Sequence, residues 1–470
     1  MVAAKPGSSS ELCAGLRARF PLCLSRDLRR MRCLLAKLGN PHHKLPPVIH
    51  VAGTNGKGSV ISTCRAIMEE AGYTVHTFTS PHLVRLNERV RIGQRGGGKL
   101  VDEDDYACAI REVELAAKGE EVTFFEVITA AAFVIFAETP ADFSLIEVGL
   151  GGRFDATNVV SPPLASVITN ISIDHECHLG TSLQGIASEK LGILKRGTPF
   201  VVSSPQAEEV VSIIQAAADS INAKLGLGLR DWKVRRNMET LVFQDETCSM
   251  TLPLPSLIGP HQYENAGTAI ATLRSAGLVT DVSTISSGLG KVHWLGRMHK
   301  LSDGPIMSLV PSGSEVWLDG CHNPGAGMAI SRVLDEIYAE CQRPFYLVLG
   351  MLDTKDHAAF LRGLLGDEDN RKRLRKAIMV PVTGNQMGQW RRGDMTQSVL
   401  QNVSDATEIL AGKAEMMEIP SESGQDFTQA LARISEIATA SQDLTPPRIL
   451  ICGSLYLMGA VLEYNGTHMT

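Results

Sequence analysis

The sequence predicts an α/β protein built on a mostly parallel sheet with helices on both faces. Short β-rich runs alternate with helical stretches through most of the 470 residues, a pattern typical of parallel strands joined by crossover helices. The length favours two or three domains, and an apolar fraction of 44% suits sizeable cores. The composition changes over Lys291–Lys300, after a Gly- and Ser-rich stretch at Ser286–Gly290. We therefore expect a domain at 1–290, a linker at 291–300 and a second domain at 301–470.

Individual elements follow from local periodicity and composition. A basic N-terminal stretch carries Leu28, Met31 and Leu34 at helical spacing, which predicts a first amphipathic helix rather than a transit peptide. Trp232–Thr251 alternates in shorter runs and predicts a small antiparallel insertion. The other expected strands are Val48–Ala52, Phe143–Val148, Ala165–Thr169, Phe200–Ser203, Glu315–Leu318, Tyr346–Leu349, Ala377–Val382 and Ile449–Cys452. The other expected helices are Lys57–Ala71, Phe125–Glu138, Gln206–Ala223, Pro324–Ala339 and Asp356–Leu365.

Charge, hydropathy and cysteine spacing narrow the classes of protein. Lys and Arg number 45 against 51 Asp and Glu, and the net charge of −6 gives no reason to expect nucleic acid or a membrane surface. The longest apolar run, near Val127–Ala137, is too short to cross a bilayer and fits a buried helix. No apolar signal segment begins the sequence, and no two of the ten cysteines share a metal-ligand or CxxC spacing. We expect a cytoplasmic protein with reduced, mostly buried thiols.

The strongest local signal for chemistry is the turn Gly53-Thr-Asn-Gly-Lys-Gly-Ser59, between a β run and a helical stretch. Glycines let backbone N–H groups close on phosphate oxygens, and a helix N-terminus adds partial positive charge. Lys57 can reach the outer phosphates, and a nearby hydroxyl can face Mg²⁺. The spacing departs from GxxxxGK[ST], because only three residues separate Gly53 from Lys57 and Gly58 precedes Ser59. The structural alternative is a tight turn with a surface lysine.

Polar residues also follow two further strands of the first domain. Glu147 ends one strand beside the loop Gly149–Phe154, which fails the GxGxxG pattern and so removes the main support for a dehydrogenase. Asp174 and His175 follow the next strand and could serve magnesium or phosphate chemistry. Lys190 lies in a helical stretch beyond them. Each has a structural alternative when taken alone: a carboxylate facing water, a hydrogen-bonded histidine and an exposed lysine.

The second domain carries a similar cluster at Trp317-Leu-Asp-Gly-Cys-His-Asn-Pro324. Asp319, His322 and Asn323 follow a strand and precede a helix. The structural alternative is a turn in which Asn and Pro act as punctuation. Three polar groups at the carboxyl edge of one strand favour a functional role instead.

These clusters together resemble the dihydrofolate synthase/folylpolyglutamate synthase family of the Mur ligase superfamily, in its bacterial bifunctional form. The resemblance runs in the family order from near residue 28 to near residue 460, and its departures, such as Leu295 for Pro and Cys321 for Ala, remove no chemical group. The segments that carry it, beyond those quoted, are Thr79-Ser-Pro-His-Leu83, Thr123-Phe-Phe-Glu126, Glu147–Asn158, Glu189-Lys190, His261-Gln262 with Asn265, Gly296-Arg297, Leu349–Asp353 and Gly453–Tyr456.

The resemblance implies an N-terminal P-loop-type ATPase domain and a smaller Rossmann-like C-terminal α/β domain, with catalysis between them. It implies that ATP and Mg²⁺ activate a carboxylate as an acyl phosphate, which the amine of L-glutamate then attacks. ATP would be bound by Gly53, Thr54, Asn55, Gly56, Lys57, Gly58, Ser59, Asn265, Arg297 and Asp319. Magnesium would be bound by Ser80, Glu147 and His175, and the pterin substrate by Thr123, Phe124, Arg153, Asp155 and Ala156. The catalytic residues would be Lys57, His175, His322 and Lys190.

The resemblance also implies a carbamate, made with CO₂, on the side chain of Lys190. That modification needs a neutral amine, so the site would have to lower the lysine's pKa. The alternative is an unmodified lysine paired with Glu189 or with a phosphate.

Several functions remain open at this point. The first is a bifunctional enzyme that joins L-glutamate to dihydropteroate and lengthens the tail of reduced folates, and a monomer is expected. A monofunctional dihydrofolate synthase is the alternative within the family, and a folylpolyglutamate synthase alone is less favoured. A ligase for a UDP-muramyl precursor would need a further domain for UDP. A phosphate-loop NTPase switch would hydrolyse ATP without regard to pteroate or glutamate.

Overall fold

The computed structural model describes residues 9–21, 27–366, 368–382, 397–441 and 445–469. The chain separates into two compact units, each described here by itself. The N-terminal unit holds the residues up to Ser256 and His261–His293. The C-terminal unit holds Leu257–Pro260 and Trp294–Met469.

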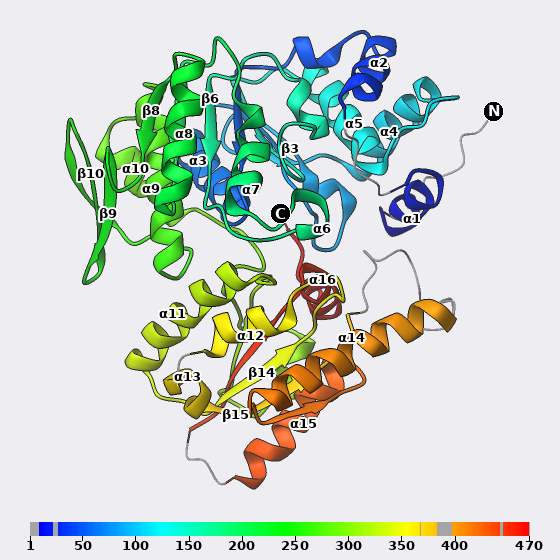
Figure 1. Ribbon diagram of the computed structural model, residues 1–470, viewed down its shortest axis with the longest axis vertical. Coiled ribbons are helices and arrows are strands. Elements are labelled where there is room, and N and C mark those ends of the chain that lie inside the picture. Colours follow the sequence, from blue (N-terminus) through cyan, green and yellow to red (C-terminus); the bar gives the residue numbers. More distant parts are fainter. Residues whose placement is uncertain (1–8, 22–26, 367, 383–396, 442–444, 470) are drawn as a thin grey trace. The chain divides into compact units, whose positions relative to one another are not determined.

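An eight-stranded sheet organises the N-terminal unit (Figure 1). Its order is β4-β3-β2-β5-β1-β6-β7-β8, and its strands pair in parallel except for β3 and β4 at one edge. Strand β1 lies between β5 and β6, so the segments that follow these three strands meet at one edge. The strands are β1 (Val48–Ala52), β2 (Val75–Phe78), β3 (Val90–Ile92), β4 (Lys99–Leu100), β5 (Phe143–Glu147), β6 (Ala165–Ile168), β7 (Phe200–Ser203) and β8 (Lys224–Leu227).

Apolar residues on both faces of this sheet are covered by helices. Ile49 and Val51 of β1 pack into one core with α3, α9 and α10, whereas Val48 packs into another with α2, α4 and α5. This alternation is the period of two expected for a strand buried on both faces. The helices are α1 (Ser9–Arg19), α2 (Arg29–Lys37), α3 (Lys57–Glu70), α4 (Glu103–Ala116), α5 (Phe124–Glu138), α6 (Glu176–Leu179), α7 (Leu183–Lys190), α8 (Glu208–Ser220), α9 (Pro260–Ser275) and α10 (Val282–Gly290), with short 3-10 helices η1 (Pro41–His43), η2 (Leu86–Arg89), η3 (Ala156–Val159) and η4 (Leu191–Ile193).

A three-stranded antiparallel sheet is the predicted insertion at Trp232–Thr251. It consists of β9 (Trp232–Asn237), β10 (Thr240–Asp245) and β11 (Ser249–Pro253) in the order β11-β10-β9. Leu241 and Phe243 of β10 are buried with Met250 and Leu252 of β11, while the residues between them are more exposed. The sheet therefore buries one face only, as antiparallel insertions commonly do.

The C-terminal unit contains a six-stranded sheet in the order β12-β13-β17-β14-β15-β16 (Figure 1). Only β12 pairs antiparallel. Its strands are β12 (His299–Leu301), β13 (Glu315–Leu318), β14 (Phe345–Leu349), β15 (Leu374–Met379), β16 (Ser421–Ser423) and β17 (Arg448–Cys452). Its helices are η5 (Pro305–Leu309), α11 (Pro324–Glu340), α12 (His357–Leu365), α13 (Glu368–Arg373), α14 (Gln397–Met416), α15 (Phe427–Ala440) and α16 (Leu455–Asn465).

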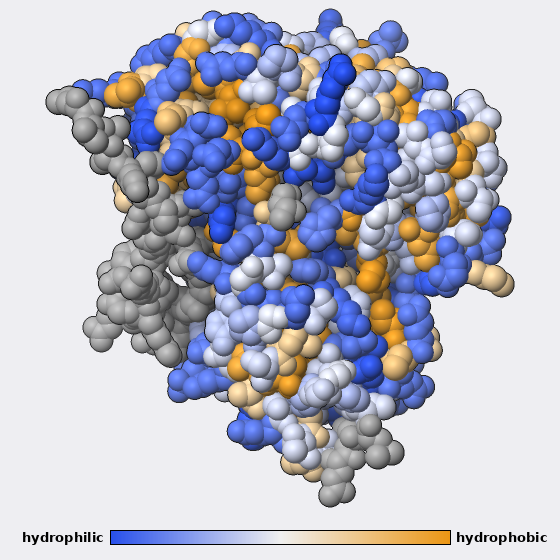
Figure 2. All heavy atoms as spheres, turned by 180° about the vertical axis from the view of Figure 1, so that it is seen from behind, coloured by the Kyte–Doolittle hydropathy of each residue, from blue (hydrophilic) through white to orange (hydrophobic). Residues whose placement is uncertain are grey.

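The α/β class and every strand and helix range named from the sequence are confirmed, with ends shifted by a few residues at most. The first amphipathic helix is α2, whose Met31, Leu34 and Leu35 are buried. Short strands such as β2, β3 and β12 were not predicted, because two to four residues carry too little periodicity. In the described part of the chain, no helix has both the length and the apolarity needed to span a membrane. The face drawn in Figure 2 is mainly hydrophilic with scattered apolar residues.

The expectation of mostly buried cysteines is wrong. Nine cysteines fall within the described residues, all of them free thiols, and Cys13, Cys64, Cys321 and Cys452 are the buried ones. Four others are exposed, since cysteines on helix surfaces give no sequence signal of their exposure.

Candidate active site

The loop after β1 folds tightly because two of its positions have no room for a side chain and are occupied by glycine. Gly53 has φ of 156°, and a Cβ there would clash with the Thr169 side chain. Gly56 has φ of 91°, and a Cβ there would clash with Asn265 of α9. The loop is also anchored from β6, because the backbone N–H groups of Thr54 and Asn55 donate to Asn170 O at 2.8 and 3.2 Å. The structure thus brings Asn265 to the phosphate loop from far along the chain.

Helix α3 starts at Lys57, directly after this loop. Its N-cap, Gly56, makes no side-chain cap, so the N–H groups of the first turn, from Lys57 to Ser59, are suited to an anion. The Lys57 amine donates to the backbone oxygens of Gly53 at 3.1 Å and Thr54 at 3.3 Å. It also lies 3.9 Å from Glu147 Oε1. The lysine therefore lies across its own loop, where a phosphate would bind, and is not a surface residue.

Glu147, Ser80 and His175 were predicted to bind a metal ion. Glu147 ends β5 and is 4% exposed, and the backbone N–H of Ser80 donates to its Oε2 at 3.1 Å. His175 has a left-handed backbone with φ of 54°, and its ring lies 3.8 Å from Asp174 Oδ2. A carboxylate and a hydroxyl are hard oxygen donors of the kind Mg²⁺ prefers. The structure places Ser80 beside Glu147, so this part of the donor set fits a magnesium ion.

Lys190, at the end of α7, is the most buried cation of the site. Its side chain is 4% exposed, and its amine donates to Gly53 O at 3.0 Å. Burial, together with the charge of Lys57, lowers the pKa of Lys190 to about 7. The amine is therefore substantially neutral near neutral pH.

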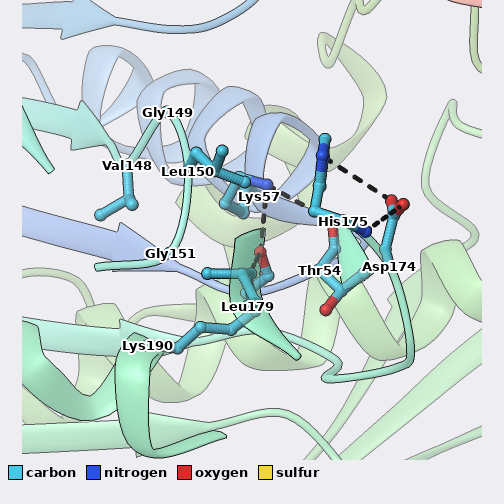
Figure 3. Close-up of a pocket in the computed structure, with 11 residues that line it drawn as sticks. Thr54, Lys57, Val148, Gly149, Leu150, Gly151, Asp174, His175, Leu179 and Lys190 are labelled. Atoms are coloured by element: carbon cyan, nitrogen blue, oxygen red, sulfur yellow. Dashed lines mark hydrogen bonds and ion pairs between the residues drawn. The ribbon is translucent and has the colours of Figure 1, made fainter. Parts of the chain in front are cut away.

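One pocket collects these groups from four segments (Figure 3). It is lined by Lys57 and Thr54 of the phosphate loop, Asp174 and His175 after β6, and Lys190. The remaining lining residues are Gly53, Val148, Gly149, Leu150, Gly151 and Leu179. The phosphate loop, the Asp174–His175 pair and Lys190, predicted separately from the sequence, thus line one pocket.

The residues predicted to bind a pterin are held by backbone contacts. Asp155 caps η3 and is 7% exposed, and its carboxylate accepts bonds from Thr157 N at 3.0 Å and Leu150 N at 2.9 Å. Burial raises the pKa of Asp155, while these bonds act against the rise. Thr123 caps α5 through a capping box with Glu126. Phe124 and Ala156 are buried at 4% and 6% exposure.

Arg153 differs from these buried residues because its side chain is exposed. Its side chain is 48% exposed, lies 3.4 Å from Glu189 Oε1, and donates to Ser188 O at 3.1 Å. Glu189 therefore pairs with Arg153. Lys190 instead donates to the loop oxygen of Gly53.

The C-terminal unit brings Arg297, Asp319 and His322 together at the end of β13. The Asp319 carboxylate accepts backbone N–H bonds from Met298 and Cys321, both at 2.8 Å. Gly320 allows close approach of Arg297, because a Cβ there would clash with the guanidinium. The His322 ring lies 2.8 Å from Gly320 O through Nδ1. Asp319 thus ties the strand end to the segment before β12.

Two buried polar residues of the N-terminal unit received no functional role from the sequence: His50 of β1 and Thr157 of η3. His50 Nε2 lies 2.9 Å from Thr157 Oγ1, and both residues are fully buried. The only sequence signal was a single histidine inside an otherwise apolar strand, which more often marks a satisfied core residue.

Comparison with known proteins defines the class first. Residues 51–273 match the Mur ligase middle domain, and residues 305–464 match the dihydrofolate synthetase C-terminal domain. The phosphate loop and its pocket therefore belong to a Mur-type ATP-dependent ligase.

The chain belongs to the dihydrofolate synthase/folylpolyglutamate synthase family. It is 34% identical to the dihydrofolate synthase/folylpolyglutamate synthase of Bacillus subtilis over 370 residues, which cover 73% of this chain and 82% of the relative. It is 28% identical to the dihydrofolate synthetase of Saccharomyces cerevisiae over 460 residues, which cover 95% and 100%.

Solved structures match the fold over nearly the whole chain. E. coli FolC in complex with DHPP and ADP has a TM-score of 0.76 and 27% identity, covering 97% of both chains. The bifunctional folylpolyglutamate synthase/dihydrofolate synthase of Yersinia pestis, complexed with AMPPNP and a Mn ion, has a TM-score of 0.78 and 25% identity, covering 98% of this chain and 99% of that one. The predicted family and fold class are confirmed.

Proposed function

We propose that this protein uses ATP to join L-glutamate to dihydropteroate, giving dihydrofolate, and to add further glutamates to reduced folates. The observation that carries the proposal is the pocket in which Lys57 and Lys190 both donate to Gly53 O beside the first turn of α3. A carboxylate is a poor electrophile, so it must first take the γ-phosphoryl group of ATP. Lys57 and the backbone dipoles of α3 would offset the charge around that group. The glutamate amine then displaces phosphate from the acyl phosphate.

Divalent metal use is part of the proposal. Ser80 and Glu147, with His175 from the pocket, would hold Mg²⁺ beside Lys57. A bound Mg²⁺ supplies positive charge to the phosphate oxygens during transfer. The Mn ion and AMPPNP bound by the Yersinia pestis relative support the use of a divalent metal with the nucleotide.

We further propose that the Lys190 amine carries a carbamate. Its support is the low pKa of Lys190, about 7, which leaves enough neutral amine to react with CO₂. The new C–N bond forms as the amine attacks CO₂, and one proton leaves the nitrogen. The product is an anion in place of a cation, so it would attract a metal ion that an ammonium would repel.

The remaining predicted residues complete the substrate sites. Asn265, which lies beside Gly56, is a further residue proposed to bind ATP, and so are Arg297 and Asp319. His322 would lie near the acyl phosphate or the incoming glutamate. Phe124, Thr123, Arg153, Asp155 and Ala156 would form the pterin side.

One observation favours a monofunctional dihydrofolate synthase as the second candidate. Residues 305–464 match a domain described for dihydrofolate synthetase, and the yeast dihydrofolate synthetase aligns over its entire length. The two candidates differ only in whether reduced folates are accepted.

The deciding experiment measures ADP release with dihydropteroate, tetrahydrofolate or methylenetetrahydrofolate, each with and without L-glutamate. The bifunctional enzyme should release ADP with all three pterins, and only when glutamate is present. Turnover with dihydropteroate alone would establish the monofunctional enzyme. ATP hydrolysis that ignores both pterin and glutamate would refute ligation.

We also propose that the enzyme is a cytoplasmic monomer. The free thiols of the nine described cysteines support a reducing compartment. Size-exclusion chromatography with light scattering, and imaging of a tagged chain in its host cell, test the two statements. A mass of about twice 50.7 kDa would refute the monomer.

A further inference from the structure

The phosphate loop is hydrogen-bonded to the segment that follows β6. The backbone N–H groups of Thr54 and Asn55 donate to Asn170 O at 2.8 and 3.2 Å. The Thr54 hydroxyl donates to Ser172 O at 3.0 Å and accepts from Ser172 N at 3.1 Å, and Asn55 Nδ2 donates to Ser172 Oγ at 3.1 Å. These bonds set the path of the loop up to Lys57, where α3 begins.

The side-chain amide of Gln206, in the segment after β7, holds the backbone on both sides of Asn170. Its Oε1 accepts from Ile171 N at 3.0 Å. Its Nε2 donates to Thr169 O at 3.0 Å and to Ser203 Oγ at 3.3 Å. One side chain thus ties the end of β7 to the segment on which the phosphate loop lies.

Ile171 N and Asn170 O belong to the same peptide group. This group is trans, and a trans peptide is planar, so its N–H and its C=O point in opposite directions. Gln206 accepts from the N–H on one side, and Thr54 and Asn55 donate to the carbonyl oxygen on the other. Rotation of the peptide plane would break these bonds together. Gln206 therefore fixes the orientation of the carbonyl that accepts from the phosphate loop.

The orientation of the Gln206 amide is set by its two backbone partners. Ile171 N can only donate and Thr169 O can only accept, so the amide oxygen must face the first and the amide nitrogen the second. The segment that carries Gln206 is itself anchored, since Ser204 N donates to Ile168 O at 2.9 Å. The contact therefore depends on both ends of the amide and starts from an ordered segment.

We propose that Gln206 is a positioning residue for ATP: by holding the Asn170 peptide group, it keeps the phosphate loop in the shape that binds the nucleotide phosphates. The inference rests on the proposed placement of ATP at this loop. Gln206 is not among the residues that line the pocket, whereas Thr54 and Lys57 are, so it acts through the loop. Without Gln206 the carbonyl can turn away, and the loop N–H groups lose their acceptor. The first turn of α3 would then shift relative to a phosphate, and small shifts of binding groups are costly.

The test measures the Kd for ADP, in the presence of Mg²⁺, in Gln206→Met and Gln206→Ala. Methionine keeps the length of the side chain and removes both bonds to the segment after β6, so the Kd should rise about fivefold to tenfold. Alanine removes the same bonds and should give the same result. The KM for ATP should rise in parallel, while the Kd for dihydropteroate stays within about twofold. Gln206 is only partly buried, so both variants should fold, which circular dichroism checks.

Gln215 of α8 provides a matched control. Its amide is also bonded at both ends, because Nε2 donates to Asp219 Oδ1 at 2.9 Å and Oε1 accepts from Arg230 Nη1 at 2.6 Å. Neither partner belongs to the phosphate loop or to the segment after β6. Gln215→Met should leave the Kd for ADP unchanged. Equal increases in the two methionine variants would reduce Gln206 to a residue of general stability and overturn the proposal.

Amide hydrogen exchange tests the link to the loop without any turnover. The N–H groups of Thr54 and Asn55 should exchange slowly in wild-type protein and about tenfold faster in Gln206→Met, measured by mass spectrometry on a fragment that contains the phosphate loop. Unchanged exchange in that variant would contradict the role of the Asn170 peptide group. If ADP does not slow exchange of this fragment in wild-type protein, the placement of ATP at the loop fails and the positioning role with it. Normal protection by ADP together with an unchanged Kd in Gln206→Met refutes the positioning role alone.

Discussion

Two lysines of the N-terminal unit donate to the same oxygen but lie in different surroundings. Lys57 Nζ lies 3.1 Å from Gly53 O, and Lys190 Nζ lies 3.0 Å from it. The Lys57 side chain is 16% exposed and lies 3.9 Å from the Glu147 carboxylate. Lys190 is 4% exposed, and burial lowers its pKa to about 7 with Lys57 as the next cause. Two lysines that share one acceptor thus differ in burial, and the more buried Lys190 has the lowered pKa.

Replacing Lys57 should have the largest effect. Lys57→Ala removes the charge beside the phosphate loop, so kcat/KM should fall by about 10³-fold, the upper end of the range for one lost electrostatic contact. The fold should persist, because the amine bonds only to the loop's own backbone oxygens and lies near Glu147. Steady-state ADP release and circular dichroism check both parts.

Lys291→Ala is the control for this comparison, since that lysine is 64% exposed and pairs with Glu70. Near-normal turnover of Lys57→Ala would contradict the phosphate-loop assignment.

Replacing Lys190 should come next. Lys190→Ala should lower kcat by about 10²-fold, and added acetate should restore part of the activity by returning a carboxylate to the place of the carbamate. Activity of the wild-type enzyme should also fall in CO₂-depleted buffer and recover with bicarbonate. Turnover at several acetate concentrations measures the rescue.

Lys195 offers a matched buried lysine. Burial lowers its pKa to about 8, and its amine donates to the backbone oxygens of Asn158 and Val160. Acetate should not rescue Lys195→Ala. Rescue of both variants to the same degree, or a bare Lys190 amine in a fully active crystal grown with bicarbonate, would rule out the carbamate.

Replacing Asp155 should affect dihydropteroate and ATP differently. Asp155→Ala removes the acceptor proposed for the pterin, so kcat/KM for dihydropteroate should fall about 10- to 100-fold while ATP affinity changes little. Kinetics with each substrate varied in turn measure the ratio. Asp102→Ala, which removes the N-cap of α4, controls for the loss of a capping carboxylate. Equal losses for dihydropteroate and ATP would assign Asp155 a purely structural role.

The last expected effect is on stability and concerns Lys190 alone. Its folded pKa is about 7, against 10.5 for a free lysine, so between these values the unfolded chain holds a proton that the folded amine lacks. The free energy of unfolding should therefore rise with pH across this window. From pH 7 to 9, wild type should gain about 2–3 kcal/mol relative to Lys190→Met. Urea unfolding in CO₂-free buffer measures this, and parallel curves for the two proteins would show that Lys190 titrates normally.

The sequence by itself determined the α/β class, the phosphate loop and the polar residues at the strand ends. Gly53, Lys57 and Glu147 were predictable because their positions depend on local periodicity and on the rule that parallel strands present their carboxyl ends at one edge. The same rule brought Asp174 and His175 to the pocket.

Only the tertiary structure decided which contacts these groups make and how their pKa values shift. Asn265 reaches Gly56 because α9 and α3 share one core on the same face of the sheet, and no local pattern encodes that contact. The low pKa of Lys190 arises from burial by segments distant in sequence, and the His50–Thr157 hydrogen bond joins residues 107 positions apart. Burial is a property of the packed interior, and the energy of a charge or a tautomer depends on which neighbours replace water around it.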